Sequence, residues 1–63
     1  MQKPVAQLTG KDGNVFNLMG IASKALVRVG KQEEAAKMNE RIHKEAESYA
    51  HALRIMSEYV EIK

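Results

Sequence analysis

Apolar residues recur at intervals of three or four through the first long segment of the chain, which is the period of an amphipathic helix. The resulting stripe consists of Val15, Leu18, Met19, Ala22, Leu26 and Val29. Gly30 follows it at the position where a left-handed residue commonly ends a helix. The pattern therefore predicts a helix over 14–29.

A second amphipathic segment covers 32–45. Its apolar stripe is thin and holds only Ala35, Met38 and Ile42, whereas most of the other positions are charged. Two of these charged residues, Glu40 and Lys44, stand at i and i+4 in the order that stabilises a helix. We therefore predict a second helix that lies on the outside of the molecule.

A third helix is predicted over 49–58. Ser48 precedes it and belongs to the residue types preferred as a helix N-cap. The face that this helix would bury holds Tyr49, Ala52, Leu53 and Met56. Nothing stronger than Ser48 separates this segment from the one before it, so a single continuous helix is the alternative.

Both ends of the chain show the alternation of apolar and polar residues that is typical of a β-strand. The first predicted strand covers 4–9, and the second covers 59–62, where Val60 and Ile62 share one face. The predicted fold class is therefore α+β, in which short N- and C-terminal strands pair as a ribbon and three helices pack on one of its faces.

The size of the chain limits what it can bury. Its 63 residues make a single small domain covering 1–63, and a domain of that size buries only about 60% of the surface that its unfolded form exposes. It has no cysteine, so disulfides and thiolate zinc sites are excluded. A two-stranded ribbon is also marginal in water and leaves its edges free to pair. We therefore expect a homo-oligomer that completes the ribbon.

Composition and charge narrow the class of protein further. Hydrophobic residues make up 44% of the chain, as in globular proteins. No apolar run approaches the roughly 20 residues of a membrane span, and no signal-like apolar core follows the N-terminus, so we expect a cytoplasmic protein. The net charge is +4 over 1–32, with five basic residues and one acidic residue, and −2 over 33–63. The basic half would attract a phosphate, an acidic partner or the acidic half of a neighbouring subunit.

The most distinctive segment is 8–16, with the sequence LTGKDGNVF. It has the order strand, glycine-containing loop and helix start, and free backbone N–H groups at such a helix N-terminus can hold an anion. The candidate ligand-binding residues are Gly10, Lys11, Asp12, Gly13 and Asn14, with Lys24 and Arg28 extending the basic surface. The alternative is a structural turn in which an Asx side chain caps the helix.

Metal and catalytic sites have weaker support. His43, Glu47 and His51 stand at i, i+4 and i+8, which would align them around a zinc ion only on one unbroken helix. The candidate hydroxyl nucleophiles are Thr9, Ser23 and Ser48, and none lies in the G-x-S-x-G pattern. We therefore assign no catalytic residue, no metal ligand and no cofactor, and we do not expect an enzyme.

One face of the first predicted helix remains without a partner. Phe16 lies off the main apolar stripe, and Gly20 lies one turn beyond it. Because a glycine inside a helix costs about 1 kcal/mol relative to alanine, a close backbone contact would explain Gly20. We predict that Phe16 and Gly20 contact a second copy of the chain.

Three segments together, 8–20, 23–26 and 49–62, resemble a family of short proteins carried by phages, plasmids and integrative elements of Gram-positive bacteria. The resemblance covers nearly the whole chain, and its most specific part is 8–20, with the sequence LTGKDGNVFNLMG. It implies a mobile-element context and supplies no catalytic residues.

These observations together predict a non-enzymatic binding protein of a phage or mobile element. As a homo-oligomer, it would counter a host defence system by sequestering a nucleotide-like signal or by blocking a host protein. The alternative is a regulatory accessory protein that binds nucleic acid or a transcription or replication partner. Nucleic acid is the less favoured partner, because Lys24, Arg28 and Lys31 form only a weak basic patch.

Overall fold

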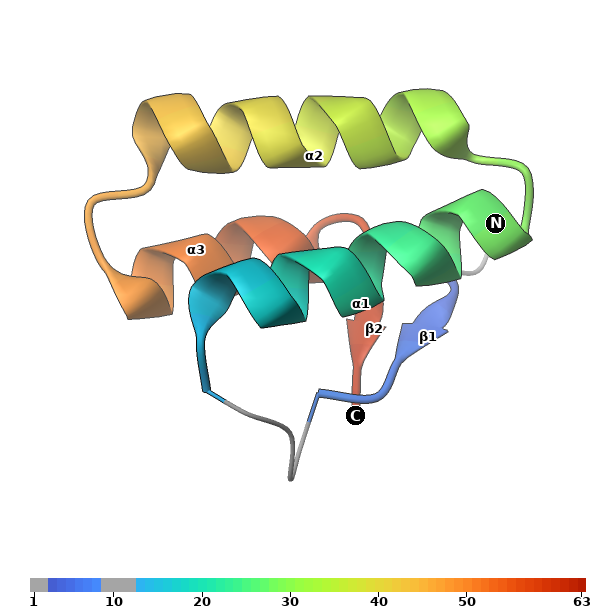
Figure 1. Ribbon diagram of the computed structural model, residues 1–63, viewed down its shortest axis with the longest axis horizontal. Coiled ribbons are helices and arrows are strands. Elements are labelled where there is room, and N and C mark those ends of the chain that lie inside the picture. The colour runs from blue at the N-terminus through green and yellow to red at the C-terminus, as the bar shows by residue number, and fades with distance from the viewer. Residues whose placement is uncertain (1–2, 9–12) are drawn as a thin grey trace.

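Five short elements follow one another in the order strand, three helices, strand, as predicted (Figure 1). The computed structural model describes residues 3–8 and 13–63. Its elements are β1 (Val5–Ala6), α1 (Val15–Arg28), α2 (Gln32–Glu45), α3 (Tyr49–Ser57) and β2 (Glu61–Ile62). The predicted α+β fold class is therefore confirmed, and each predicted helix boundary lies within one residue of the observed one. None of the helices in these ranges combines the length and the apolar character needed to cross a bilayer.

Gly30 ends α1 in the way that the sequence predicts. Its φ of 80° lies in the left-handed region, which side chains disfavour and glycine tolerates. Its N–H donates to the carbonyl of Val27 at 2.9 Å, and the N–H of Lys31 donates to the carbonyl of Leu26 at 2.9 Å. These two bonds are those of a Schellman motif, which satisfies the last carbonyls of the helix and turns the chain toward α2.

The helices α2 and α3 are separate, so the alternative of one continuous helix is wrong. Ala46 follows α2 with an extended backbone, at ψ 122°. The Ser48 hydroxyl then accepts a hydrogen bond from the N–H of His51 at 3.1 Å. The N–H of Glu47 donates to Nδ1 of the same His51 at 3.2 Å. Ser48 is therefore the N-cap of α3, as predicted.

The two strands pair in parallel, with Val5 opposite Glu61 and Ala6 opposite Ile62. The N–H of Glu61 donates to the carbonyl of Pro4 at 2.8 Å, and that of Lys63 donates to the carbonyl of Ala6 at 3.0 Å. The regular strands are shorter than the predicted 4–9 and 59–62.

The hydrogen bonds between the two strands continue past Ala6 to Leu8 and past Ile62 to Lys63, whereas the residues just before β2 form a turn. The N–H of Leu8 donates to the carbonyl of Lys63 at 2.8 Å, whereas Thr9 lies outside the described residues. At the other strand, the N–H groups of Tyr59 and Val60 both donate to the carbonyl of Met56 at 2.9 Å. Tyr59 and Val60 therefore form a turn after α3, and the second predicted strand begins two residues too early.

The helices cover one face of the ribbon. In Figure 1, α1 and α3 lie next to the strands and α2 lies on the far side of these two helices. Ala6 is buried and Ile62 is partly buried on the covered face, while Val5 and Glu61 are exposed on the other. The outer position predicted for the second helix is therefore confirmed.

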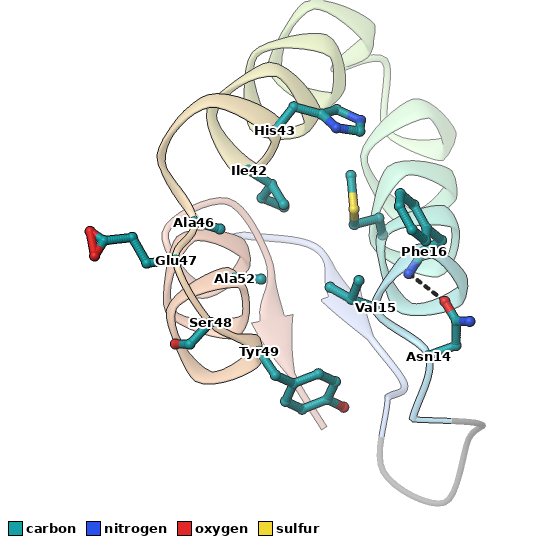
Figure 2. A pocket seen from close by; sticks show the side chains of 11 residues that line it. Asn14, Val15, Phe16, Ile42, His43, Ala46, Glu47, Ser48, Tyr49 and Ala52 are labelled. Atoms are coloured by element: carbon teal, nitrogen blue, oxygen red, sulfur yellow. Dashed lines mark hydrogen bonds between the residues drawn. The ribbon is translucent and has the colours of Figure 1, made fainter.

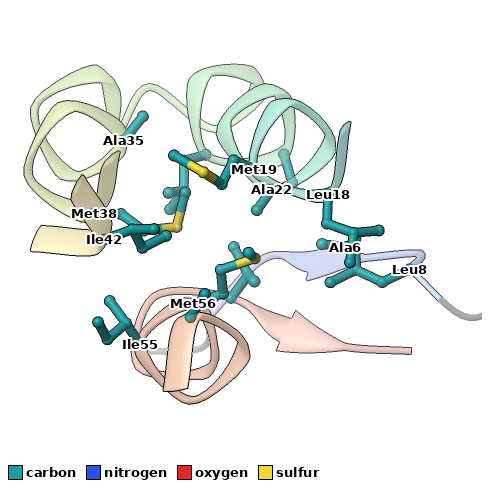
Figure 3. Packing of buried hydrophobic residues seen from close by; sticks show 14 residues of the cluster. Ala6, Leu8, Leu18, Met19, Ala22, Ala35, Met38, Ile42, Ile55 and Met56 are labelled. Carbon is teal, nitrogen blue, oxygen red and sulfur yellow. The ribbon is translucent and has the colours of Figure 1, made fainter. Parts of the chain in front are cut away.

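One apolar core joins the three helices to β1 and to the turn before β2, and Ile62 of β2 packs against it (Figure 3). It consists of Ala6, Leu8, Leu18, Met19, Ala22, Ala25, Leu26, Ala35, Met38, Ile42, Ala52, Ile55, Met56 and Val60. All three residues predicted to be buried on α2 belong to it. No buried polar or charged side chain is found in the described part of the chain. The core therefore depends on apolar packing alone.

The predicted inner faces of α1 and α3 need correction. Val29 is 53% exposed because it follows the last residue of α1 as its C-cap. On α3, Tyr49 is 48% exposed and Leu53 is only partly buried, whereas Ile55 is buried. The stripe through Ile55 also has helical spacing. Packing of α3 against α1, α2 and β2 selects it, and the pattern alone does not distinguish the two stripes.

Candidate functional site

An open groove of about 510 Å³ lies at the end of the molecule where α1 and α3 begin and α2 ends (Figure 2). We call it the end groove. Its lining consists of Asn14, Val15, Phe16, Met19, Ile42, His43, Ala46, Glu47, Ser48, Tyr49 and Ala52. All three helices contribute to it, so the groove forms only in the folded chain.

The floor of the end groove is apolar and two of its walls are aromatic. Met19, Ile42 and Ala52 are buried core residues that close the groove from below. Phe16 and Tyr49 stand beside them with 66% and 48% of their surfaces exposed. Large aromatic side chains left this exposed beside an apolar hollow are typical of a surface that binds a partner.

Local bonds hold Phe16 in place. The Asn14 side chain caps α1 by accepting a hydrogen bond from the N–H of Phe16 at 2.8 Å. The Phe16 ring lies 6.2 Å from the His43 ring, centroid to centroid, with an interplanar angle of 38°. A tilted ring pair at this distance is favourable. Phe16 therefore stands between its own helix cap and the last turn of α2.

The charge of the end groove is low. Among the described residues that line it there is no lysine and no arginine. The one carboxylate belongs to Glu47, and in Figure 2 its side chain points away from the groove. The hydroxyl of Ser48 is already occupied as the cap of α3. These features suit apolar and aromatic ligand groups better than anionic ones.

The predicted anion loop is only partly visible. Gly10, Lys11 and Asp12 lie outside the described residues. Gly13 is exposed, and a Cβ built on it would lie 3.8 Å from the Tyr49 hydroxyl, so the end of the loop lies beside the end groove. Asn14 lines the groove and caps α1, as the structural alternative proposed.

The other two predicted ligand residues lie elsewhere. Lys24 and Arg28 line a second hollow, of about 500 Å³, between α1 and β1. Neither contributes to the end groove, whose contacts with α1 are confined to its first turns. The structure therefore separates the basic residues of α1 from Asn14 and places them on different surfaces.

Several of the residues considered for metal binding and catalysis make structural contacts. His51 belongs to the cap of α3, and the break after α2 removes the helical alignment of His43, Glu47 and His51. The hydroxyl of Ser23 accepts a hydrogen bond from Nδ2 of Asn39 at 3.0 Å, which joins α1 to α2. Thr9 lies outside the described residues.

Gly20 is exposed on α1, and a Cβ built there would meet no described atom beyond its own turn of the helix within 4 Å. The close backbone contact suggested for it is therefore not made by residues 3–8 or 13–63. We expect Gly20→Ala to raise the free energy of unfolding by about 1 kcal/mol, because alanine has the higher helix propensity. Urea denaturation followed by circular dichroism measures this change.

Ala36→Gly, at an exposed position of α2, is the matched control and should lower the same quantity by a similar amount. A loss of stability in Gly20→Ala that deepens with protein concentration would contradict the expectation. It would show instead that a second copy lies against Gly20. The contact of a second copy with Gly20 and Phe16 stays a prediction.

A polar cluster that the sequence did not indicate joins α2 to the turn before β2. Nη1 and Nη2 of Arg41 donate to the two carboxylate oxygens of Glu58 at 2.8 and 3.3 Å. Nη1 also donates to the Tyr59 hydroxyl at 3.2 Å, and the guanidinium lies 5.7 Å from the centre of the Tyr59 ring. Hydrogen bonds from Arg41 hold the pKa of the Glu58 carboxyl below its ordinary value of 4.5, assisted by the charges of Arg41 and Lys3.

This cluster makes stability depend on pH. Because the pKa of Glu58 is lowered in the folded state, its contribution is complete above pH 4.5 and is lost as the pH falls through the lower folded value. We expect Glu58→Gln to be less stable than wild type at neutral pH and the difference to shrink in acid.

Urea denaturation of both proteins from neutral pH to pH 3 measures this difference. Glu40→Gln, which removes a more exposed ion pair with Lys44 at 3.5 Å, is the control and should show a smaller effect. A difference between wild type and Glu58→Gln that is the same at every pH would contradict the assignment.

Comparison with known proteins gives no match, whether to a protein family, to a curated protein or to a solved structure. The resemblance to short mobile-element proteins therefore stays an expectation from the sequence. The function has to be inferred from the surfaces of the molecule, and among these the end groove has the most specific lining.

Proposed function

We propose that this chain is a non-enzymatic binding protein whose end groove accepts an apolar or aromatic side chain of a partner protein. The observation that carries the proposal is the pair of exposed aromatic residues, Phe16 and Tyr49, on either side of an apolar floor. Aromatic residues at the centre of an interface contribute much of the binding energy when they are desolvated on association.

The lining of the groove supports a protein partner over a nucleotide-like ligand. A phosphate needs positively charged or N–H donor groups, and the described lining holds neither lysine nor arginine. The Asn14 side chain also occupies the N–H of Phe16, which an anion would otherwise use. An apolar side chain needs no such partner and gains from leaving water.

The biological setting of this proposal comes from the sequence. Its resemblance to short proteins of phages and mobile elements supports a role in which the chain blocks a protein of a host defence system. Binding by occlusion requires no catalytic group, and a small surface with a few aromatic contacts is enough for it. Self-association through Phe16 would compete with this partner for the same surface.

A plating experiment tests both the anti-defence role and the end groove as the binding surface. The chain is expressed in bacterial strains that each carry one defence system, and the plating efficiency of a sensitive phage is measured. We expect wild type to restore plating against at least one system. The double variant Phe16→Ser, Tyr49→Ser should lose this effect, because removing such contacts weakens binding by about 30-fold or more.

Val27→Ser is the matched control, since Val27 is 47% exposed on α1 and does not line the groove. If the double variant restores phage plating as well as wild type does, the end groove is not the binding surface. Failure of wild type against every system would overturn the anti-defence role. A nucleotide that raises the melting temperature of wild type but not of the double variant would replace the protein partner with a small ligand.

A further inference from the structure

The hollow between β1 and α1 has a different lining from the end groove. Val5, Ala6 and Gln7 form its strand side, and its helix side consists of Asn17, Ile21, Lys24, Ala25 and Arg28. Its volume of about 500 Å³ is similar to that of the end groove. We call it the strand hollow. A strand edge on one side and a helix on the other make a site for an extended chain.

The strand side of this hollow presents an unpaired edge. On β1, the bonds to β2 use the carbonyls of Pro4 and Ala6 and the N–H of Leu8. Because a parallel ladder alternates along each strand, the backbone groups of Val5 and Gln7 point to the opposite side. Within 3–8 and 13–63 neither of these two residues makes a backbone hydrogen bond. Two N–H donors and two carbonyl acceptors are therefore available to an added strand.

The helix side of the hollow is basic above an apolar floor. Lys24 and Arg28 are exposed one turn apart on α1, and neither forms an ion pair with the described residues. Ala25 is buried and Ile21 is partly buried. The hollow therefore combines two free positive charges with a small apolar surface.

The spacing of the charges matches an extended chain. Residues four apart on a helix are separated by about 6 Å along its axis. Alternate residues of a β-strand are separated by about 6.6 Å and lie on the same face. Two acidic residues at i and i+2 of a bound strand would therefore reach Lys24 and Arg28, and an apolar residue at i−2 would lie over Ile21.

We propose that the strand hollow binds an extended acidic segment of a partner protein, which pairs with the outer edge of β1 and places alternate carboxylates against Lys24 and Arg28. A second copy of this chain is disfavoured at this edge. A symmetric pair of β1 strands would bring the Lys24 and Arg28 side chains of both copies to the same side of the sheet, and like charges repel. The proposal does not depend on the function of the end groove.

The test uses a blocked heptapeptide in which one valine and two glutamates alternate with threonine. It is titrated into the whole chain, and binding is followed by two-dimensional amide NMR spectra. We expect shifts at Val5, Gln7, Lys24 and Arg28, and unchanged binding in the end-groove variant Phe16→Ser. The charge-reversed variant Lys24→Glu, Arg28→Glu should bind at least about tenfold more weakly. The same peptide with lysines in place of glutamates should bind this variant.

A proline substitution isolates the backbone contribution. The N–H of Gln7 points away from β2, so Gln7→Pro removes an outer donor and keeps the bonds of the ribbon. We expect Gln7→Pro to stay folded by circular dichroism and to lose about tenfold in peptide affinity, whereas Gln7→Ala keeps it.

Three results would overturn the proposal. The first is that peptide at about 1 mM causes no shift at Val5 and Gln7, because a dissociation constant well above about 1 mM would be too weak for a specific site. The second is self-association of wild type that Gln7→Pro abolishes, which would assign the edge to a second copy. The third is stronger, salt-sensitive shifts of the same residues with a duplex DNA oligonucleotide, which would assign the hollow to nucleic acid.

Discussion

Replacing Leu26 with alanine is expected to leave little of the protein folded at room temperature. Leu26 is 1% exposed on α1, inside the apolar core of the molecule. Truncating a buried leucine costs about 2–5 kcal/mol, because apolar contacts are lost and a cavity remains. A single core in a chain of this size supplies only about 3–5 kcal/mol in total. Urea denaturation followed by circular dichroism measures the loss.

The next residue on the same helix provides the control. Val27 is 47% exposed, so Val27→Ala removes methyl groups that are already in contact with water. Its effect should stay within about 0.5 kcal/mol. Equal losses for Leu26→Ala and Val27→Ala would mean that the inner face of α1 is not the one described.

The second large effect is expected for Val60→Asp, which should prevent folding at neutral pH. Val60 is fully buried in the turn between α3 and β2. The described part of the chain has no buried charged or polar side chain, so an aspartate there would find no buried partner. An unpaired buried carboxylate is one of the few changes that cost more than about 4 kcal/mol.

A valine-to-aspartate substitution on the exposed face of the ribbon is the control, because it separates the cost of burying a charge from the cost of placing an aspartate in a strand. Val5 is 52% exposed on β1, and Val5→Asp should cost no more than about 1 kcal/mol. Amide NMR spectra distinguish a dispersed, folded pattern from a collapsed one in both variants. A well-dispersed spectrum for Val60→Asp would contradict the inward position of Val60.

Much of this fold is predictable from local signals, because these act over a few residues. Gly30 ends α1 through its left-handed backbone, and Ser48 begins α3 through its hydroxyl, as their residue types indicate. The apolar stripe of α2 contains Ala35, Met38 and Ile42 alone, so only one inner face was available. Where several stripes compete, as on α3, tertiary packing decides and the sequence does not show which one is buried.

The candidate site was less accessible to sequence reasoning. Phe16 stood out because it lies off the main stripe of α1, and the structure leaves it exposed on the end groove. Tyr49 was predicted to face inward, so the second aromatic wall was missed. The partnership of Arg41 with Glu58 and Tyr59 joins positions 17 and 18 residues apart, and no local pattern indicates it. Such contacts form only when two elements pack together, and the spacing of residues along the chain does not predict them.

The parallel ribbon also sets the order in which the molecule can be completed. Val5 pairs with Glu61, so β1 has no partner until all three helices and β2 have been synthesised. Before β2 has been synthesised, the helices can already contact one another and α1 can contact β1, and these contacts are the more local ones. Until then the backbone of β1 has no strand beside it, so a nascent chain exposes an unpaired strand edge that can pair with a neighbour.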